Sequence, residues 1–108
     1  MKPAFFLGDS RVVIRDFPAD ACQDAGYQIG LVQEGKEPLN WKPLPIVGPG
    51  AREIRVRDPS GAYRVIYTAN FPEAVYVLHA FQKKTPATPK RELDLAARRL
   101  ALLNRQRS

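Results

Sequence analysis

Three short segments in the middle of the chain carry the pattern of β-strands and are separated by tight turns. Residues 53–57 alternate charged and apolar side chains, residues 63–68 are rich in aromatic and β-branched residues, and residues 74–81 form a third apolar segment. Turn signals occupy residues 58–61 and 70–73. Because strands joined by such short turns run antiparallel, the sequence predicts an antiparallel meander.

Helical patterns flank this meander on both sides. A short helix is predicted over residues 11–17, after the capping residues Asp9 and Ser10. A second helix is predicted over residues 18–35, and a third begins at the Thr88-Pro89 pair and runs to the tail. Their apolar positions recur at helical spacing. These positions are Cys22, Ala25, Ile29 and Val32 in the second helix, and Leu93, Ala96, Ala97, Leu100 and Leu103 in the third.

The segment between the second helix and the meander cannot be regular helix. Residues 36–50 contain four prolines and two glycines, yet they also carry Trp41 and Leu44, which need burial. We therefore expect a structured connector rather than a linker between domains. The 108 residues, 44% of them hydrophobic, predict one α+β domain over residues 1–108, with the helices segregated from an antiparallel sheet.

The positive charge is concentrated in one half of the chain. The formal net charge is +6, but residues 1–51 carry five basic and six acidic side chains, whereas residues 52–108 carry twelve and five. This asymmetry indicates a polyanionic partner, with nucleic acid first and an acidic protein or membrane surface second. One cysteine and one histidine exclude a Cys/His zinc site and an internal disulfide, and no apolar segment is long enough to span a membrane. We expect a cytoplasmic protein without metal or cofactor.

The strand period predicts where these cations lie. Glu53, Arg55 and Arg57 share one face of the first strand, while Ile54 and Val56 share the buried face. Two interpretations stay open: a phosphate cradle, since Arg and Lys bind phosphate, or a solvated strand face that keeps the protein soluble. The cations expected to converge on one sheet surface are Arg52, Arg55, Arg57, Arg64, Lys83 and Lys84.

Other candidate residues carry weaker signals. His79 suits acid–base catalysis, but its apolar neighbours in the third strand favour a structural role. Tyr63, Tyr67 and Tyr76 are either core aromatics or platforms for a nucleobase. The chain lacks a phosphate-binding glycine loop, a helical His-Glu-x-x-His zinc motif and a Gly-x-Ser-x-Gly nucleophile motif. An enzyme built from these residues would therefore depend on cations around a phosphate.

An ordered set of segments spans most of the chain and resembles a known family. The segments are residues 42–44, 52–56, 63–67 and 77–85, followed by Pro89 and a last helix that contains Arg98-Arg99. Together they resemble the phage-derived HigB-like branch of the RelE/ParE toxin superfamily. The resemblance implies a compact RelE-like fold, in which an N-terminal helical hairpin packs on a curved antiparallel sheet and a helix closes the chain.

The resemblance also implies an activity. Relatives of the RelE and HigB kind are toxins of type II toxin–antitoxin systems that cut messenger RNA on the ribosome and so inhibit translation. In these relatives the 2′-hydroxyl attacks the neighbouring phosphate without a metal ion or cofactor. The implied partners are a HigA-like helix-turn-helix antitoxin, the ribosome and messenger RNA, with no membrane involved. Two alternatives remain, namely a non-enzymatic ParE-type toxin that binds gyrase and an inactive remnant that binds only its antitoxin.

The resemblance assigns roles to particular residues. It implies that Arg55 and Arg64 are catalytic, together with Lys83 or Lys84 after the last strand. Relatives often carry a tyrosine near the start of the last helix, where this chain reads Thr88-Pro89-Lys90. Proton transfer is therefore expected from Glu53 or His79. The residues expected to bind substrate are Arg52, Arg57, Tyr67 and Lys90.

Overall fold

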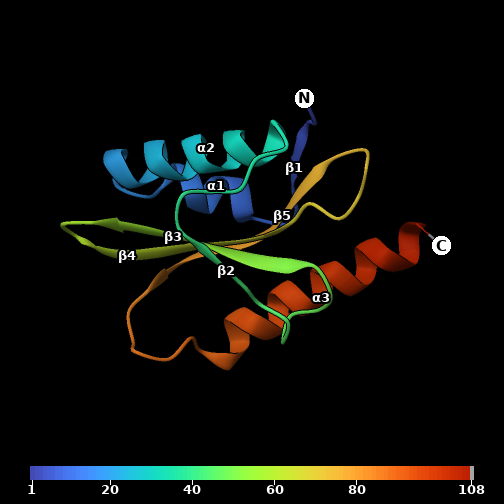
Figure 1. The fold of residues 1–108 in the computed structure, drawn as a ribbon. Helices are drawn as coiled ribbons and strands as arrows, with labels where there is room; N and C mark the ends of the chain where they lie inside the picture. Colours follow the sequence, from blue (N-terminus) through green and yellow to red (C-terminus); the bar gives the residue numbers. More distant parts are fainter. Residues whose placement is uncertain (108) are drawn as a thin grey trace.

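A five-stranded mixed sheet forms the middle layer of the molecule, and helices cover both of its faces (Figure 1). The structure is a computed structural model that describes residues 1–107. Its strand order is β1-β5-β4-β3-β2. In chain order the elements are β1 (Ala4–Phe6), α1 (Ser10–Arg15), α2 (Ala19–Gln33), β2 (Trp41–Pro43), β3 (Ala51–Asp58), β4 (Gly61–Thr68), β5 (Val75–Lys83) and α3 (Lys90–Arg107).

The predicted meander is confirmed in β3, β4 and β5, which pair antiparallel in sequence order. Alternate side chains of these strands enter two separate hydrophobic clusters, one on each face of the sheet. Ile54 and Val65 lie opposite each other and pack toward α1 and α2, whereas Ile66 packs toward α3. Because both faces are covered, the sheet has one hydrophobic core on each side.

Two short edge strands were not predicted from the sequence. β2 lies within the proline-rich connector and pairs antiparallel with β3. β1 lies near the N-terminus and pairs parallel with β5, so the sheet is mixed rather than wholly antiparallel. Each edge strand has only three residues, which is too short for a two-residue alternation to be recognised. The two edges together widen the predicted three-stranded meander to five strands.

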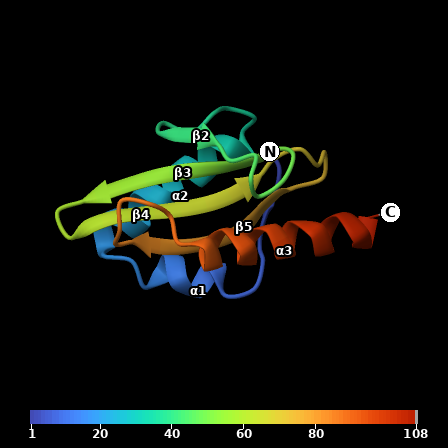
Figure 2. The same ribbon diagram turned by 90° about the horizontal axis from the view of Figure 1, so that it is seen from below.

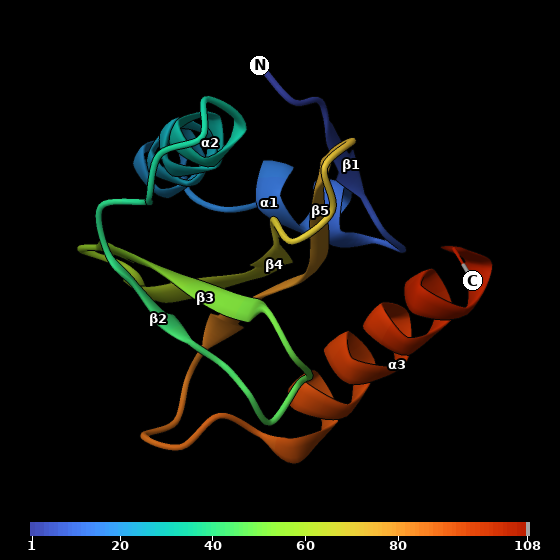
Figure 3. The ribbon, with the colours of Figure 1, turned by 45° about the vertical axis from the view of Figure 1, so that its right-hand side comes forward.

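The helices divide between the two faces as Figure 3 shows, with α1 and α2 on one side and α3 on the other. Figure 2, seen from below, shows α3 in front of the sheet, along β5. The predicted apolar stripes are confirmed. Ala25, Ile29 and Val32 of α2 are buried in one cluster, and Ala96 and Leu100 of α3 are buried in the other.

Two details at the helix ends differ from the prediction. Asp9 makes no side-chain capping hydrogen bond at the start of α1, because its carboxylate instead accepts a hydrogen bond from Arg99. α3 begins at Lys90, and the carbonyl of Pro89 accepts the first hydrogen bonds of the helix. Gly35 does end α2 as predicted, with a φ of +84° that favours glycine. None of the helices within residues 1–107 is long and apolar enough to span a membrane.

A β-bulge in β5 controls which side chains face α3. Ile66 pairs with His79, but the next residue of β4, Tyr67, pairs with Val77, so Leu78 is an extra residue in β5. Leu78 lies in the cluster beneath α3, and the adjacent His79 bonds to side chains of α3. Two consecutive residues of one strand therefore face the same helix.

Candidate functional site

Cations from four neighbouring strands line up on the face of the sheet that α3 covers. The register places Arg55 of β3 opposite Arg64 of β4, and Lys42 of β2 opposite Glu53 of β3. Arg57 lies two residues after Arg55 in β3. It is in line with Lys83 of β5, because both residues pair with the same residue of β4. We call Lys42, Arg55, Arg57, Arg64 and Lys83 the cationic row.

One buried carboxylate lies within this row. The side chain of Glu53 is 2% exposed, and its Oε1 is 3.9 Å from Lys42 Nζ, 3.5 Å from Arg55 Nε and 3.6 Å from Arg64 Nε. Arg64 is itself buried, whereas Arg55 and Lys42 have side chains that are 39% and 46% exposed. Three cations thus share a single carboxylate oxygen, which leaves the row with a net positive charge.

Hydrogen bonding between Glu53 and the arginines around it is incomplete. Glu53 Oε2, Arg55 Nε and Arg64 Nε are all buried and have no hydrogen-bond partner within residues 1–107. The Arg64 guanidinium donates one hydrogen bond from Nη1 to the carbonyl of Tyr63. A guanidinium has five N–H donors, and the one on Arg64 Nε has no hydrogen-bond acceptor within residues 1–107. Buried polar groups are nearly always satisfied in proteins, and donors left unpaired around one carboxylate indicate a place where an anion gains hydrogen bonds.

Electrostatics point in the same direction. Burial lowers the pKa of Arg64, the Glu53 carboxylate opposes that effect, and repulsion by Arg55 and Arg57 lowers the pKa further. Arginine nevertheless stays protonated, because its ordinary pKa lies far above neutrality. The fold therefore holds a positive charge where it is destabilised by its surroundings. A phosphate bound at this point would relieve that repulsion.

His79 is built into the joint between β5 and α3. Its Nε2 is 2.7 Å from Glu92 Oε1, and its Nδ1 is 3.4 Å from Arg99 Nη1. Since an arginine only donates, this arrangement assigns the proton to Nε2, which donates to Glu92. Arg99 also donates to the carbonyl of Leu78 and to Asp9. Both ring nitrogens of His79 are thus engaged inside the protein, and the residue is 4% exposed.

The lysines predicted around the site lie in different surroundings. Lys83 belongs to the row by its position in β5, but its Nζ donates to the carbonyls of Thr85 and Pro86, so it holds the segment that follows β5. Lys84 is exposed and lines a hollow beside the first turn of α3. Lys90 pairs with Asp94, four residues along α3, and its side chain is 87% exposed.

The prediction that all six cations converge on one surface is wrong for Arg52. By the strand period Arg52 faces away from Arg55, and its guanidinium stacks on the Trp41 ring at 4.3 Å. Its cross-strand neighbour Tyr67 lies in the cluster beneath α1 and α2 and is 1% exposed. Burial raises the pKa of Tyr67, and nearby Arg52 counteracts this. These two predicted substrate-binding residues are therefore on the opposite face from the cationic row.

Sequence reasoning missed three residues that shape this region. Lys42 belongs to the edge strand β2, which carries no recognisable strand pattern, although its place before Pro43 was part of the family resemblance. Glu92 and Arg99 fix His79 from α3, and no spacing in the sequence relates them to a residue of β5. Within residues 1–107, no group of three or more His, Cys, Asp and Glu side chains is arranged to hold a metal ion.

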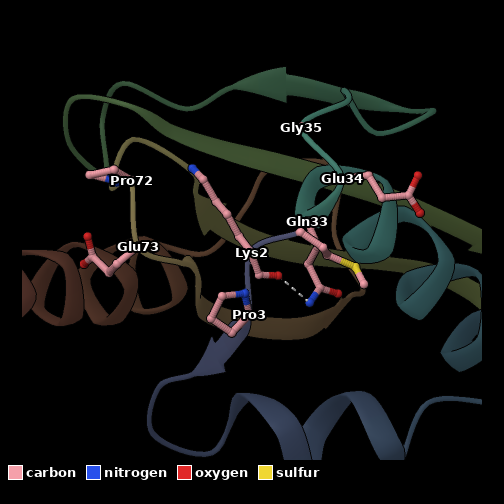
Figure 4. Close-up of a pocket in the computed structure, with 8 residues that line it drawn as sticks. Lys2, Pro3, Gln33, Glu34, Gly35, Pro72 and Glu73 are labelled. Carbon is pink, nitrogen blue, oxygen red and sulfur yellow. Dashed lines mark hydrogen bonds between the residues drawn. The ribbon is translucent and has the colours of Figure 1, made fainter.

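A second region with polar groups lies away from the row, at the N-terminal edge of the sheet. Figure 4 shows a hollow lined by Lys2, Gln33 and Glu73, in which the Gln33 side chain donates to the carbonyl of Lys2. The Lys2 ammonium donates to the carbonyls of Ala69 and Phe71. These groups tie the N-terminal segment to α2 and to the β4–β5 turn, which accounts for their arrangement.

The fold and the site define a class of protein: a small α+β domain whose sheet presents a positively charged row around one buried carboxylate, suited to a polyanion. The chain belongs to the phage-derived Gp49-like family (DUF891), whose model matches residues 13–101. This family is associated with toxins of the RelE/HigB kind. No curated protein matches the chain.

Proposed function

We propose that the protein is the toxin of a type II toxin–antitoxin system and that it cuts messenger RNA on the ribosome. The observation that carries this proposal is the set of three cations, Lys42, Arg55 and Arg64, held around one oxygen, Oε1, of the buried Glu53. Membership of a family associated with RelE/HigB-like toxins supports it. The proposed partners are a HigA-like helix-turn-helix antitoxin, the ribosome and messenger RNA.

In the proposed reaction the 2′-hydroxyl of one nucleotide attacks the phosphate that follows it. The bond between O2′ and phosphorus forms while the bond between phosphorus and O5′ breaks, and the products are a cyclic phosphate and a 5′-hydroxyl. The attacking hydroxyl loses a proton and the leaving oxygen gains one. Negative charge grows on the phosphate oxygens in the transition state, so fixed cations stabilise this state more than the substrate.

The surroundings of each cation suggest a division of labour. Arg64 is buried and held in place, so it provides a preorganised charge that needs no rearrangement during the reaction. Arg55 and Lys42 are partly exposed and are able to contact the phosphate from the solvent side. Glu53 is too deeply buried to reach a substrate, and we assign it the role of positioning these cations rather than of taking the proton.

The experiment compares growth, translation and messenger RNA ends after induced expression of the protein and of single variants. The sharpest variant is Arg55→Ala, because this partly exposed side chain can be removed with little risk to folding. We expect cleavage to fall about 100-fold or more, the usual loss when one charge-stabilising donor is removed. Arg15→Ala is the matched control, since Arg15 is an exposed cation of α1 on the opposite face. It should cut as well as the unmodified protein.

Three outcomes would overturn the proposal. The first is unchanged cleavage in Arg55→Ala and in Arg64→Lys, when both variants retain the circular dichroism spectrum of the unmodified protein. The second is gyrase-linked DNA breakage with intact messenger RNA, which would show a ParE-type toxin. The third is normal growth and translation when the protein is produced without an antitoxin, which would show a remnant that no longer acts as a toxin.

A further inference from the structure

A hollow of about 430 Å³ lies beside the cationic row, between the end of β5 and the first turn of α3. The segment that joins these elements swings out below the sheet and forms one of its walls (Figure 1, orange). Phe81 and Pro89 provide apolar surface, Gln82 provides an exposed amide, and Glu92 is bonded to His79. This combination of apolar surface and a few polar groups is typical of a ligand site.

The cations of the hollow are Lys84 and Arg91, neither of which is committed to a close partner. Lys84 has no hydrogen bond or ion pair within residues 1–107, and the Arg91 side chain is 84% exposed. The carboxylate nearest to Arg91 is that of Glu92, 4.0 Å away, and its other oxygen is bonded to His79 at 2.7 Å. Both cations are therefore free to bind an anion, in contrast to Lys83, which is held by two carbonyls.

The hollow adjoins the cationic row through the register of the sheet. Arg64 of the row pairs directly with Phe81, which lines the hollow, and paired strands lie about 4.8 Å apart. A single strand of RNA with one phosphate against Arg55 and Arg64 would bring its adjoining nucleotide to Phe81. The cations at the rim are then placed for that nucleotide's own phosphate.

We propose that this hollow is a second nucleotide subsite, which binds the RNA nucleotide next to the one whose phosphate is attacked. Lys84 and Arg91 hold its phosphate, and its base lies against Pro89 and the edge of Phe81. The inference rests on the proposed function, because it takes the cationic row as the place of the attacked phosphate. It gives Arg91 a role that the sequence analysis did not, and it gives Lys84 a binding role rather than a catalytic one.

The test measures binding and cleavage separately. Binding is followed by fluorescence anisotropy of a short labelled uridine oligonucleotide, without ribosomes, over a range of salt concentrations. Each phosphate contact to a single strand contributes a slope of about 0.7 in the dependence of log K on log salt. Because Lys84 and Arg91 hold one phosphate between them, the double variant K84A/R91A should lose about 0.7 from the slope and bind about 5-fold more weakly at 0.1 M salt. The matched control is R15A/K36A, which removes the same charge from α1 and from the segment that follows α2.

The outcomes distinguish this inference from the function on which it rests. If Arg55→Ala weakens binding and cleavage while K84A/R91A binds like R15A/K36A, the cationic row binds RNA but the hollow is no subsite, and the inference is wrong. If Arg55→Ala and Arg64→Lys both fold and cut as well as the unmodified protein, the proposed function itself fails. Weaker binding by K84A/R91A, with a smaller salt slope and a higher messenger RNA concentration needed for cleavage, confirms the second subsite.

Discussion

At the scale of single residues, the organising contact of the molecule is a buried carboxylate, that of Glu53, surrounded by cations. Arg55 and Arg64 lie directly opposite each other on neighbouring strands, an arrangement that destabilises a sheet unless it is compensated. Glu53 compensates it with one oxygen, 3.5 Å and 3.6 Å from the two Nε atoms. The cluster thus combines a cost in folding with the positive charge that binding requires, a combination common at functional sites.

The first prediction concerns Glu53→Gln, which keeps the shape of the side chain and removes its charge. We expect the free energy of unfolding to fall by about 3 kcal/mol, because Arg64 is left buried without a counter-charge. Chemical denaturation measures this loss. Glu34→Gln is the control, since it breaks only the exposed pair with Lys36 and should cost less than about 1 kcal/mol.

The same variant separates a positioning residue from a general base. A positioning residue alters the rate of cleavage but not its pH profile, whereas loss of a general base removes the acidic limb of that profile. We expect Glu53→Gln to cut more slowly with a profile of unchanged shape. Disappearance of the acidic limb would contradict this assignment and would return Glu53 to the role of base.

At the scale of elements, the strands that carry the site were predictable because their side chains alternate. The two-residue period of β3 correctly placed Arg55 and Arg57 on one face and Ile54 and Val56 on the other. The same period, applied to Arg52, puts it on the opposite face, where it stacks on Trp41. Arg52 lies close to Arg55 and Arg57 in the sequence, which suggested that all three face the same surface. The alternation of side chains along the strand instead separates Arg52 from the other two.

The missing parts of the site depend on contacts that sequence spacing does not encode. Lys42 reaches Glu53 only because the connector forms β2 and pairs with β3. The ammonium of Lys83 is taken up by carbonyls of the segment that follows it, a loop whose conformation has no periodic signature. The bonds from α3 to His79 depend on how a distant helix crosses the sheet.

A second prediction tests the contact between the connector and α3. Gly48 has a φ of +151°, and a Cβ at this position would lie 2.6 Å from Cδ2 of the buried Leu100. Gly48→Ala should therefore lower the free energy of unfolding by about 1 to 3 kcal/mol. Gly30→Ala is the matched comparison, because a Cβ there meets nothing within 4 Å and Gly30 lies within α2. It should raise stability by about 0.5 to 1 kcal/mol. Equal effects of the two substitutions in thermal denaturation would contradict the packing described.

At the scale of the whole molecule, an ion pair joins parts of the chain that are far apart in sequence. Arg99 Nη2 of α3 donates to Asp9 Oδ1, just before α1, over 3.0 Å. This hydrogen bond from Arg99 holds the pKa of Asp9 below its ordinary value of 3.8. A carboxylate with a lowered pKa adds stability above its unfolded value, and the contribution is lost as the pH falls through its folded value.

The third prediction follows from the lowered pKa of Asp9. Asp9→Asn should lower the free energy of unfolding by less than about 1 kcal/mol at pH 7, because the Asp9 side chain is 59% exposed. The difference from the unmodified protein should shrink as the pH falls below about 3.8 and vanish once Asp9 is protonated in the folded state. Parallel thermal denaturation of both proteins over this pH range provides the measurement. A difference that persists in acid would show that the aspartate acts by packing rather than by charge.

The distribution of charge now has a structural meaning. The near-neutral first half of the chain supplies α1 and α2, whereas the basic second half supplies α3 and every member of the cationic row except Lys42. The two layers lie on opposite sides of the sheet (Figure 3). The side of the sheet with the cationic row and α3 therefore carries most of the positive charge. Under the proposed function, this uneven charge orients the protein during its approach to RNA.

Because β5 contains one extra residue, the face that its last side chains occupy depends on whether the number of residues before them is odd or even. The side chains of β5 alternate between the two faces of the sheet, and this alternation is shifted by one residue at Leu78. The number of residues between Val77 and Phe81 therefore decides which face Phe81 and Lys83 occupy. In a relative with one residue more or fewer here, Phe81 and Lys83 would face the other side of the sheet, and Phe81 would no longer line the hollow next to Arg64. Insertions or deletions that preserve the site must therefore change this stretch by an even number of residues.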